Sequence, residues 1–124
     1  MGMQSTRVVV VLFVLAGLTL AARGSPAADR HLEFIHRLQQ KGYADVALDY
    51  LDSLETRSGL PPKIREILDL ERCNSYLAWA KTPSDPKTTE RRLARAQTYL
   101  NKFLKEHPNH PRAATAMAFW GDSA

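Results

Sequence analysis

The 124-residue sequence contains a single cysteine, Cys73. A disulfide within one chain needs two cysteines, so internal bridges cannot hold this fold together. Cys73 lies three residues after Leu70 and four before Leu77, among apolar neighbours at helical spacing. We predict a small buried hydrophobic residue at this position, with a reactive thiol or an intermolecular bridge as the alternatives.

The sequence also lacks the common motifs of catalytic and nucleotide-binding sites. It has no Gly-rich phosphate loop, no His-Glu-x-x-His, no Cys-x-x-Cys and no Gly-x-Ser-x-Gly. His107 and His110 are three residues apart, but prolines hold them in a linker and a zinc site needs three or four ligands. His31 and His36 are five residues apart, so they point in different directions on a helix. We therefore predict no enzyme activity, no metal site and no cofactor.

The sequence also lacks a large excess of positive or negative charge. Of the 17 Lys and Arg residues, Arg7 and Arg23 fall in the first 24 residues, which leaves 15 against 13 Asp and Glu. These charges are mixed in sign, whereas a nucleic-acid surface is a basic stripe with stacking aromatics. We predict no nucleic-acid partner. Three acidic residues do share a helix face, and we expect either a solvated face or a docking site for a basic partner: Asp45, Asp49 and Asp52.

The first 24 residues have the three-part order of a secretory signal peptide. A short start with one positive charge precedes the uncharged run 8–22, and small residues follow with cleavage points near 24 or 27. A membrane-spanning helix needs about 20 apolar residues, and this run is shorter. We expect export to the periplasm or the cell envelope. The alternative is an uncleaved leader that anchors the protein, and only then is the membrane a partner.

The remainder, residues 25–124, is predicted to be one all-α domain. Helices are expected over about 29–41, 43–56, 62–81, 86–106 and 111–120, with breaks at Gly and Pro residues. Asp29 is the expected cap of the first helix. The third is apolar over much of its circumference, which indicates neighbours on more than one side. Tyr50, Trp79, Tyr99 and Trp120 are candidates for packing between helices, or for lining a groove.

One short pattern occurs twice. Residues 47–54 and, 49 positions later, residues 96–103 both read Ala-x-x-Tyr-Leu-x-x-[Leu/Phe]. A small residue, with large apolar residues four and seven positions on, forms a helix face that another helix can approach closely. Repeated units of this kind are typical of helical solenoids, which bury a core between neighbouring repeats.

Residues 29–124 resemble tetratricopeptide repeats, in which an A helix pairs with a B helix. The resemblance departs from the family in two ways: the Trp, Leu and Gly of its A helix are not recognisable, and the interval of 49 exceeds the family's 34. Gly59 also stands where the first copy would have its Pro. The linker 101–111 is similar to those of bacterial envelope members. The residues that match the B-helix positions are Ala47, Leu51 and Leu54 in the first copy and Ala96, Leu100, Phe103 and Pro108 in the second.

The resemblance implies antiparallel helix pairs stacked as an α-solenoid, whose concave face binds proteins or peptides without a cofactor. We therefore expect a non-enzymatic protein–protein interaction scaffold. The alternatives are the N-terminal repeat region of a larger envelope protein or enzyme, whose active domain lies beyond this chain, and a membrane-anchored assembly factor.

The end of the sequence is an apolar stretch with no polar capping helix after it. We expect this end to continue into a longer array or to self-associate, because an uncapped solenoid exposes apolar surface. The stretch contains Ala113, Ala114, Ala116, Met117, Ala118, Phe119 and Trp120.

Overall fold

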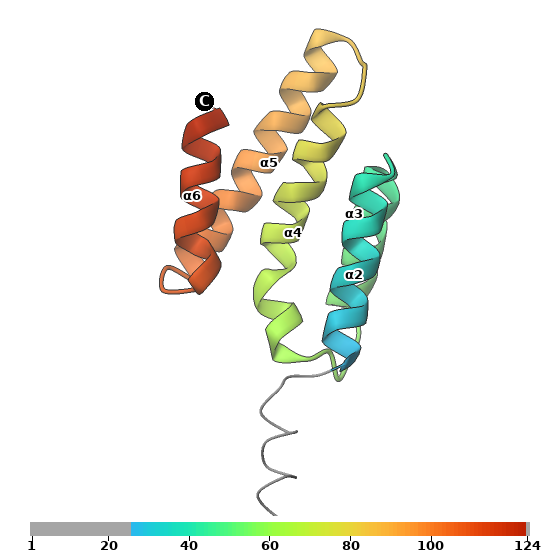
Figure 1. The fold of residues 1–124 in the computed structure, drawn as a ribbon, viewed down its shortest axis with the longest axis vertical. Helices are drawn as coiled ribbons and strands as arrows, with labels where there is room; N and C mark the ends of the chain where they lie inside the picture. Colours follow the sequence, from blue (N-terminus) through green and yellow to red (C-terminus); the bar gives the residue numbers. More distant parts are fainter. Residues whose placement is uncertain (1–25, 124) are drawn as a thin grey trace, which may run out of the picture.

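The computed structural model describes residues 26–123, with side chains described for residues 26–117. Within this range the chain is all-helical, and successive helices run antiparallel and stack side by side (Figure 1). The prediction of an all-α fold with helix pairs stacked as an α-solenoid is confirmed. The predicted leader lies outside the described residues. The helices are α2 (Pro26–Gln40), α3 (Ala44–Glu55), α4 (Pro62–Ala80), α5 (Pro86–Glu106) and α6 (Pro111–Ser123).

The first helix begins at Pro26, so the prediction that Asp29 caps it is wrong. Proline is tolerated in a first turn because the N–H that it lacks would have no partner there. The extra turn also contributes Ala28 to the core, where it is fully buried. At the other end Gly42 adopts a φ of 86°, and the Tyr43 N–H donates to the Leu38 carbonyl at 2.8 Å. A left-handed glycine of this kind ends α2 and turns the chain into α3.

Helix α4 lies in the middle of the stack and belongs to two apolar clusters (Figure 1). The first cluster joins α2, α3 and the N-terminal half of α4, and it includes Ile35, Leu51 and Ile64. The second joins α4 to α5 and α6, and it includes Leu70 and Phe103. Because α4 has helices on several sides, the apolar residues from Ile64 to Cys73 are buried.

The apolar residues of the repeated pattern are buried on both α3 and α5. All of the patterned Ala, Leu and Phe residues are buried, whereas Pro108 is exposed in the linker between α5 and α6. Leu93 of α5 has the spacing of an inward residue, three positions before Ala96, but it is 41% exposed because the described helices do not cover that side of α5. The buried pattern residues are Ala47, Leu51, Leu54, Ala96, Leu100 and Phe103.

The alanines of the pattern provide a test of close helix packing. Ala96 is 0% exposed on α5, so Ala96→Leu should force extra volume into a filled contact and lower the free energy of unfolding by roughly 1–3 kcal/mol. Ala94→Leu is the matched control, because Ala94 is an exposed alanine of the same helix. Urea denaturation followed by circular dichroism measures both variants. Equal stability of the two variants would show that Ala96 does not face a neighbouring helix.

Candidate functional site

Two oppositely charged residues lie side by side in the middle of α4, and both are buried. Glu71 is 0% exposed and Arg72 is 4% exposed. Successive residues of a helix point about 100° apart, so the two side chains reach different neighbouring helices. The mainly apolar pattern of this helix does not identify either residue as buried.

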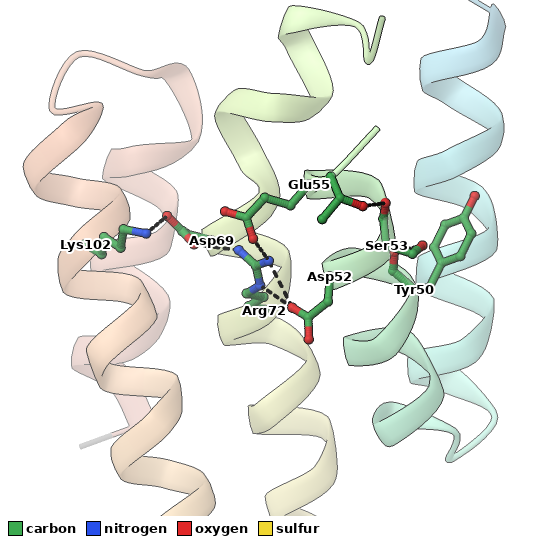
Figure 2. Close-up of polar contacts among 8 residues, drawn as sticks. Tyr50, Asp52, Ser53, Glu55, Asp69, Arg72 and Lys102 are labelled. Carbon is green, nitrogen blue, oxygen red and sulfur yellow. Dashed lines mark hydrogen bonds and ion pairs between the residues drawn. The ribbon is translucent and has the colours of Figure 1, made fainter. Parts of the chain in front are cut away.

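Arg72 is surrounded by carboxylates from its own helix and from α3 (Figure 2). Its guanidinium donates to Asp52 at 3.0 Å, to Glu55 at 2.5 Å and to Asp69 at 3.0 Å. Lys102 of α5 lies 3.4 Å from the other oxygen of Asp69. Burial alone would lower the pKa of Arg72, but its bonds to Glu55, Asp52 and Asp69 raise it. The network therefore joins α3, α4 and α5 through a permanently charged side chain.

Glu71 makes the corresponding connections on the other side of α4. Its carboxylate accepts from His36 at 3.2 Å and from Gln39 at 3.2 Å, both on α2. Arg112, in the first turn of α6, lies 3.1 Å from the same Glu71 oxygen as His36. A buried carboxylate is tolerated only when its bonding capacity is filled. Among the described residues, no buried side-chain nitrogen or oxygen is left without a hydrogen-bond partner.

Two hollows flank Asn74 and Leu77 of α4, and we call them together the inner groove. The first hollow, which we call the slot, lies between α4 and α6 and has a volume of about 210 Å³. The second hollow lies between the C-terminal ends of α2 and α4. The slot is lined by Leu70, Cys73, Asn74, Leu77, Leu100, Arg112, Thr115 and Ala116. The second hollow is lined by Gln39, Gln40, Gly42, Asn74, Leu77, Ala78, Lys81 and Thr82.

The floor of the slot is apolar and unreactive. Leu70, Cys73 and Leu100 are each less than 5% exposed there. Burial raises the pKa of the Cys73 thiol to about 12, and the charge of Glu71 adds to this shift. The thiol therefore stays protonated at neutral pH and behaves as a small hydrophobic residue, as the sequence predicts.

The aromatic residues mainly pack helices together. Tyr76 of α4 stacks on Tyr99 of α5 with ring centres 5.8 Å apart. The guanidinium of Arg92 lies 4.2 Å from the ring centre of Trp79, an attractive cation–π distance. Tyr50 of α3 is 2.6 Å from a ring nitrogen of His31 on α2. Tyr50, Trp79 and Tyr99 thus lie in contacts between helices, while the side chain of Trp120 is outside the described part.

The histidines and aspartates singled out in the sequence do not form a shared site. His107 and His110 both pack against Phe103, with ring centres 5.6 and 5.4 Å away. His31 bonds to Tyr50 and His36 to Glu71, so these two have separate partners. Across residues 26–123, no group of three or more His, Cys, Asp or Glu side chains is arranged to hold a metal ion. Asp45 and Asp49 are exposed, and Asp52 reaches Arg72.

Comparisons with known proteins leave the chain unassigned: no family model, no curated protein and no solved structure matches it. Among the helices that the structure describes, none has the length and apolar character required to cross a membrane.

The burial of Arg72 predicts a large effect on stability. Arg72→Met removes the hydrogen bonds to Asp52, Glu55 and the nearly buried Asp69, which keeps Lys102, so we expect a loss of about 2 kcal/mol in the free energy of unfolding. Arg91→Met, at an exposed position of α5, should change stability by less than about 0.5 kcal/mol. Chemical denaturation of both variants tests this. A loss below about 1 kcal/mol for Arg72→Met would mean that the network contributes no more than an exposed ion pair.

Proposed function

We propose that this protein is a non-enzymatic interaction scaffold of the tetratricopeptide type, which holds an extended segment of another protein in its inner groove. The observation that carries the proposal is the slot between α4 and α6, an apolar hollow bordered by polar side chains. The groove runs along α2, α4 and α6, the first helices of successive pairs.

The slot has the size and chemistry to take one apolar side chain of a partner. Its volume of about 210 Å³ suits a residue such as leucine, and burying that side chain fully contributes about 1.5–3 kcal/mol. Asn74 lies between the two hollows, and its amide group both donates and accepts hydrogen bonds. An extended backbone needs both kinds of partner, so Asn74 is suited to hold the segment beside its anchored residue.

The polar groups beside the groove support binding rather than catalysis. Arg112 and His36 are engaged by Glu71, which holds α6 and α2 against α4. Cys73 is buried as a neutral thiol, which is a poor nucleophile. Covalent catalysis needs an activated nucleophile with a base beside it, whereas His36 and Arg112 are bonded to Glu71.

The leader-like residues 1–24 support placing this scaffold in the periplasm or the cell envelope. We propose two related alternatives beside this one. In one, the chain is the N-terminal repeat region of a larger envelope protein or enzyme. In the other, it is an assembly factor that an uncleaved leader keeps at the membrane. In each case the inner groove is the surface that binds the partner.

Filling the slot should weaken peptide binding without unfolding the protein. Ala116 lines the slot and is half-buried, so Ala116→Leu places a larger side chain where the partner's anchor would lie. Ala114→Leu is the matched control, since Ala114 is exposed on the same helix and does not line the slot. A random dodecamer peptide display library, panned against the full chain, supplies peptides for fluorescence anisotropy.

Burial of one leucine-sized anchor corresponds to a change of roughly tenfold to a hundredfold in dissociation constant. We expect a weakening of this size for Ala116→Leu and unchanged binding for Ala114→Leu. Equal binding by both variants would place the peptide elsewhere, and the inner groove would lose its proposed role.

A second surface supports self-association. Phe34, Tyr43 and Val46 are 44%, 54% and 43% exposed on the α2–α3 pair, and Met117 of α6 is 57% exposed. Exposed apolar side chains at both ends of a stack favour end-to-end contact between copies, α6 of one against α2 and α3 of the next. We propose this contact as the way in which the C-terminal end is covered.

Analytical ultracentrifugation checks this association. We expect the sedimentation coefficient of the full chain to rise with concentration in the micromolar range. Val46→Glu should reduce the rise by placing a charge in the apolar contact, whereas Asp49→Glu, exposed on the same helix, should leave it unchanged. A stable monomer at high micromolar concentration, with cooperative unfolding, would contradict the proposed contact.

A further inference from the structure

The side chains that line the inner groove carry positive charge and no negative charge. Arg112 borders the slot, Lys81 borders the second hollow, and none of the lining residues is Asp or Glu. Glu71 lies beside Arg112 but is fully buried, so it presents no carboxylate to a bound segment. The hollow beside Arg72 differs, because Glu55, Asp69 and other acidic residues line it together with basic ones. Of these three hollows, only the two of the inner groove are lined without acidic residues.

Arg112 is the residue best placed to bind a carboxylate in this groove. Its side chain is 39% exposed, and it approaches Glu71 through one nitrogen at 3.1 Å. A guanidinium has five N–H donors in a planar fork, so further donors remain for a ligand. The bond to Glu71 also fixes the side chain, which lowers the conformational entropy lost when a ligand binds.

We propose that the inner groove selects acidic segments, in which an Asp or Glu lies within about three residues of a leucine-sized side chain. The apolar side chain occupies the slot, and the carboxylate accepts from the guanidinium of Arg112 at its border. Lys81 adds attraction for further negative charge along the groove. This inference rests on the proposed function, because it specifies the chemistry of the segment that the scaffold holds.

The first test is the composition of peptides that the full chain selects from the random dodecamer library. We expect enrichment of peptides that combine Asp or Glu with a nearby Leu, Ile, Met or Phe, relative to panning against Ala116→Leu. Enrichment of basic or uncharged peptides that still depend on Ala116 would overturn the acidic preference and leave the scaffold function standing. Absence of any enriched peptide would overturn both.

The second test isolates the carboxylate contact. In an enriched peptide, exchange of the acidic residue for its amide should weaken binding to the unchanged protein by about tenfold or more, because a charge-assisted hydrogen bond is lost. The same exchange should have little effect on binding to Arg112→Gln, since the contact is already absent there. Arg95→Gln is the control, because Arg95 is an exposed residue of α5 that does not line the groove. With this variant, exchanging the peptide's acidic residue for its amide should weaken binding as much as it does with the unchanged protein.

Arg112→Gln also removes a partner of Glu71, so circular dichroism and thermal unfolding accompany the binding measurements. Should that variant not fold, Arg112→Lys keeps the positive charge and loses the planar fork, and we expect it to bind the acidic peptide less tightly than the unchanged protein. Affinity for the acidic peptide should also fall as salt is raised. Equal binding of the acidic and amide peptides by the unchanged protein, at low salt, would overturn the proposal.

Discussion

The arrangement of the helices depends on two buried charges at adjacent positions of α4. Glu71 bonds to α2 through His36 and Gln39 and to α6 through Arg112. Arg72 bonds to α3, and Asp69 continues the network to Lys102 of α5. Burying a charge costs several kcal/mol unless its bonds are made, so displacing any of these helices would leave part of that cost uncompensated. Apolar burial is non-directional, and these bonds add direction to it.

The same carboxylate connects the fold to the proposed site. Glu71 holds Arg112 in the first turn of α6, and Arg112 borders the slot between α6 and α4. The bond therefore sets how closely α6 approaches α4 and also presents the guanidinium to the groove. A scaffold gains from such coupling, because a binding group already fixed by a structural bond loses less freedom when a partner arrives.

Local patterns in the sequence predict the helices well and the buried charges poorly. The spacing of Ala96, Leu100 and Phe103 identifies a buried face because it depends only on helical periodicity. The sequence pattern does not predict that α2 begins at Pro26, because Ala28 is buried by contacts with residues far along the chain. Glu71 is missed for the same reason: its partners Gln39 and Arg112 lie 32 residues before it and 41 after it. Adjacent opposite charges inside an apolar helix are the one local sign of such a pair.

The position of α4 also explains where the molecule exposes apolar surface. In a solenoid each unit contacts only its neighbours, so a helix in the middle is covered on both sides and the end helices on one. Helix α4 contributes to both apolar clusters, whereas Phe34 of α2 and Met117 of α6 remain exposed at the two ends of the stack. Exposure at these positions follows from the linear order of the helices, and it requires no local defect in packing. The inner groove has a different origin, because it lies along α4, where Asn74 and Leu77 border both hollows. One order of stacking therefore accounts both for the apolar side chains exposed on the outer described helices and for the two hollows beside α4.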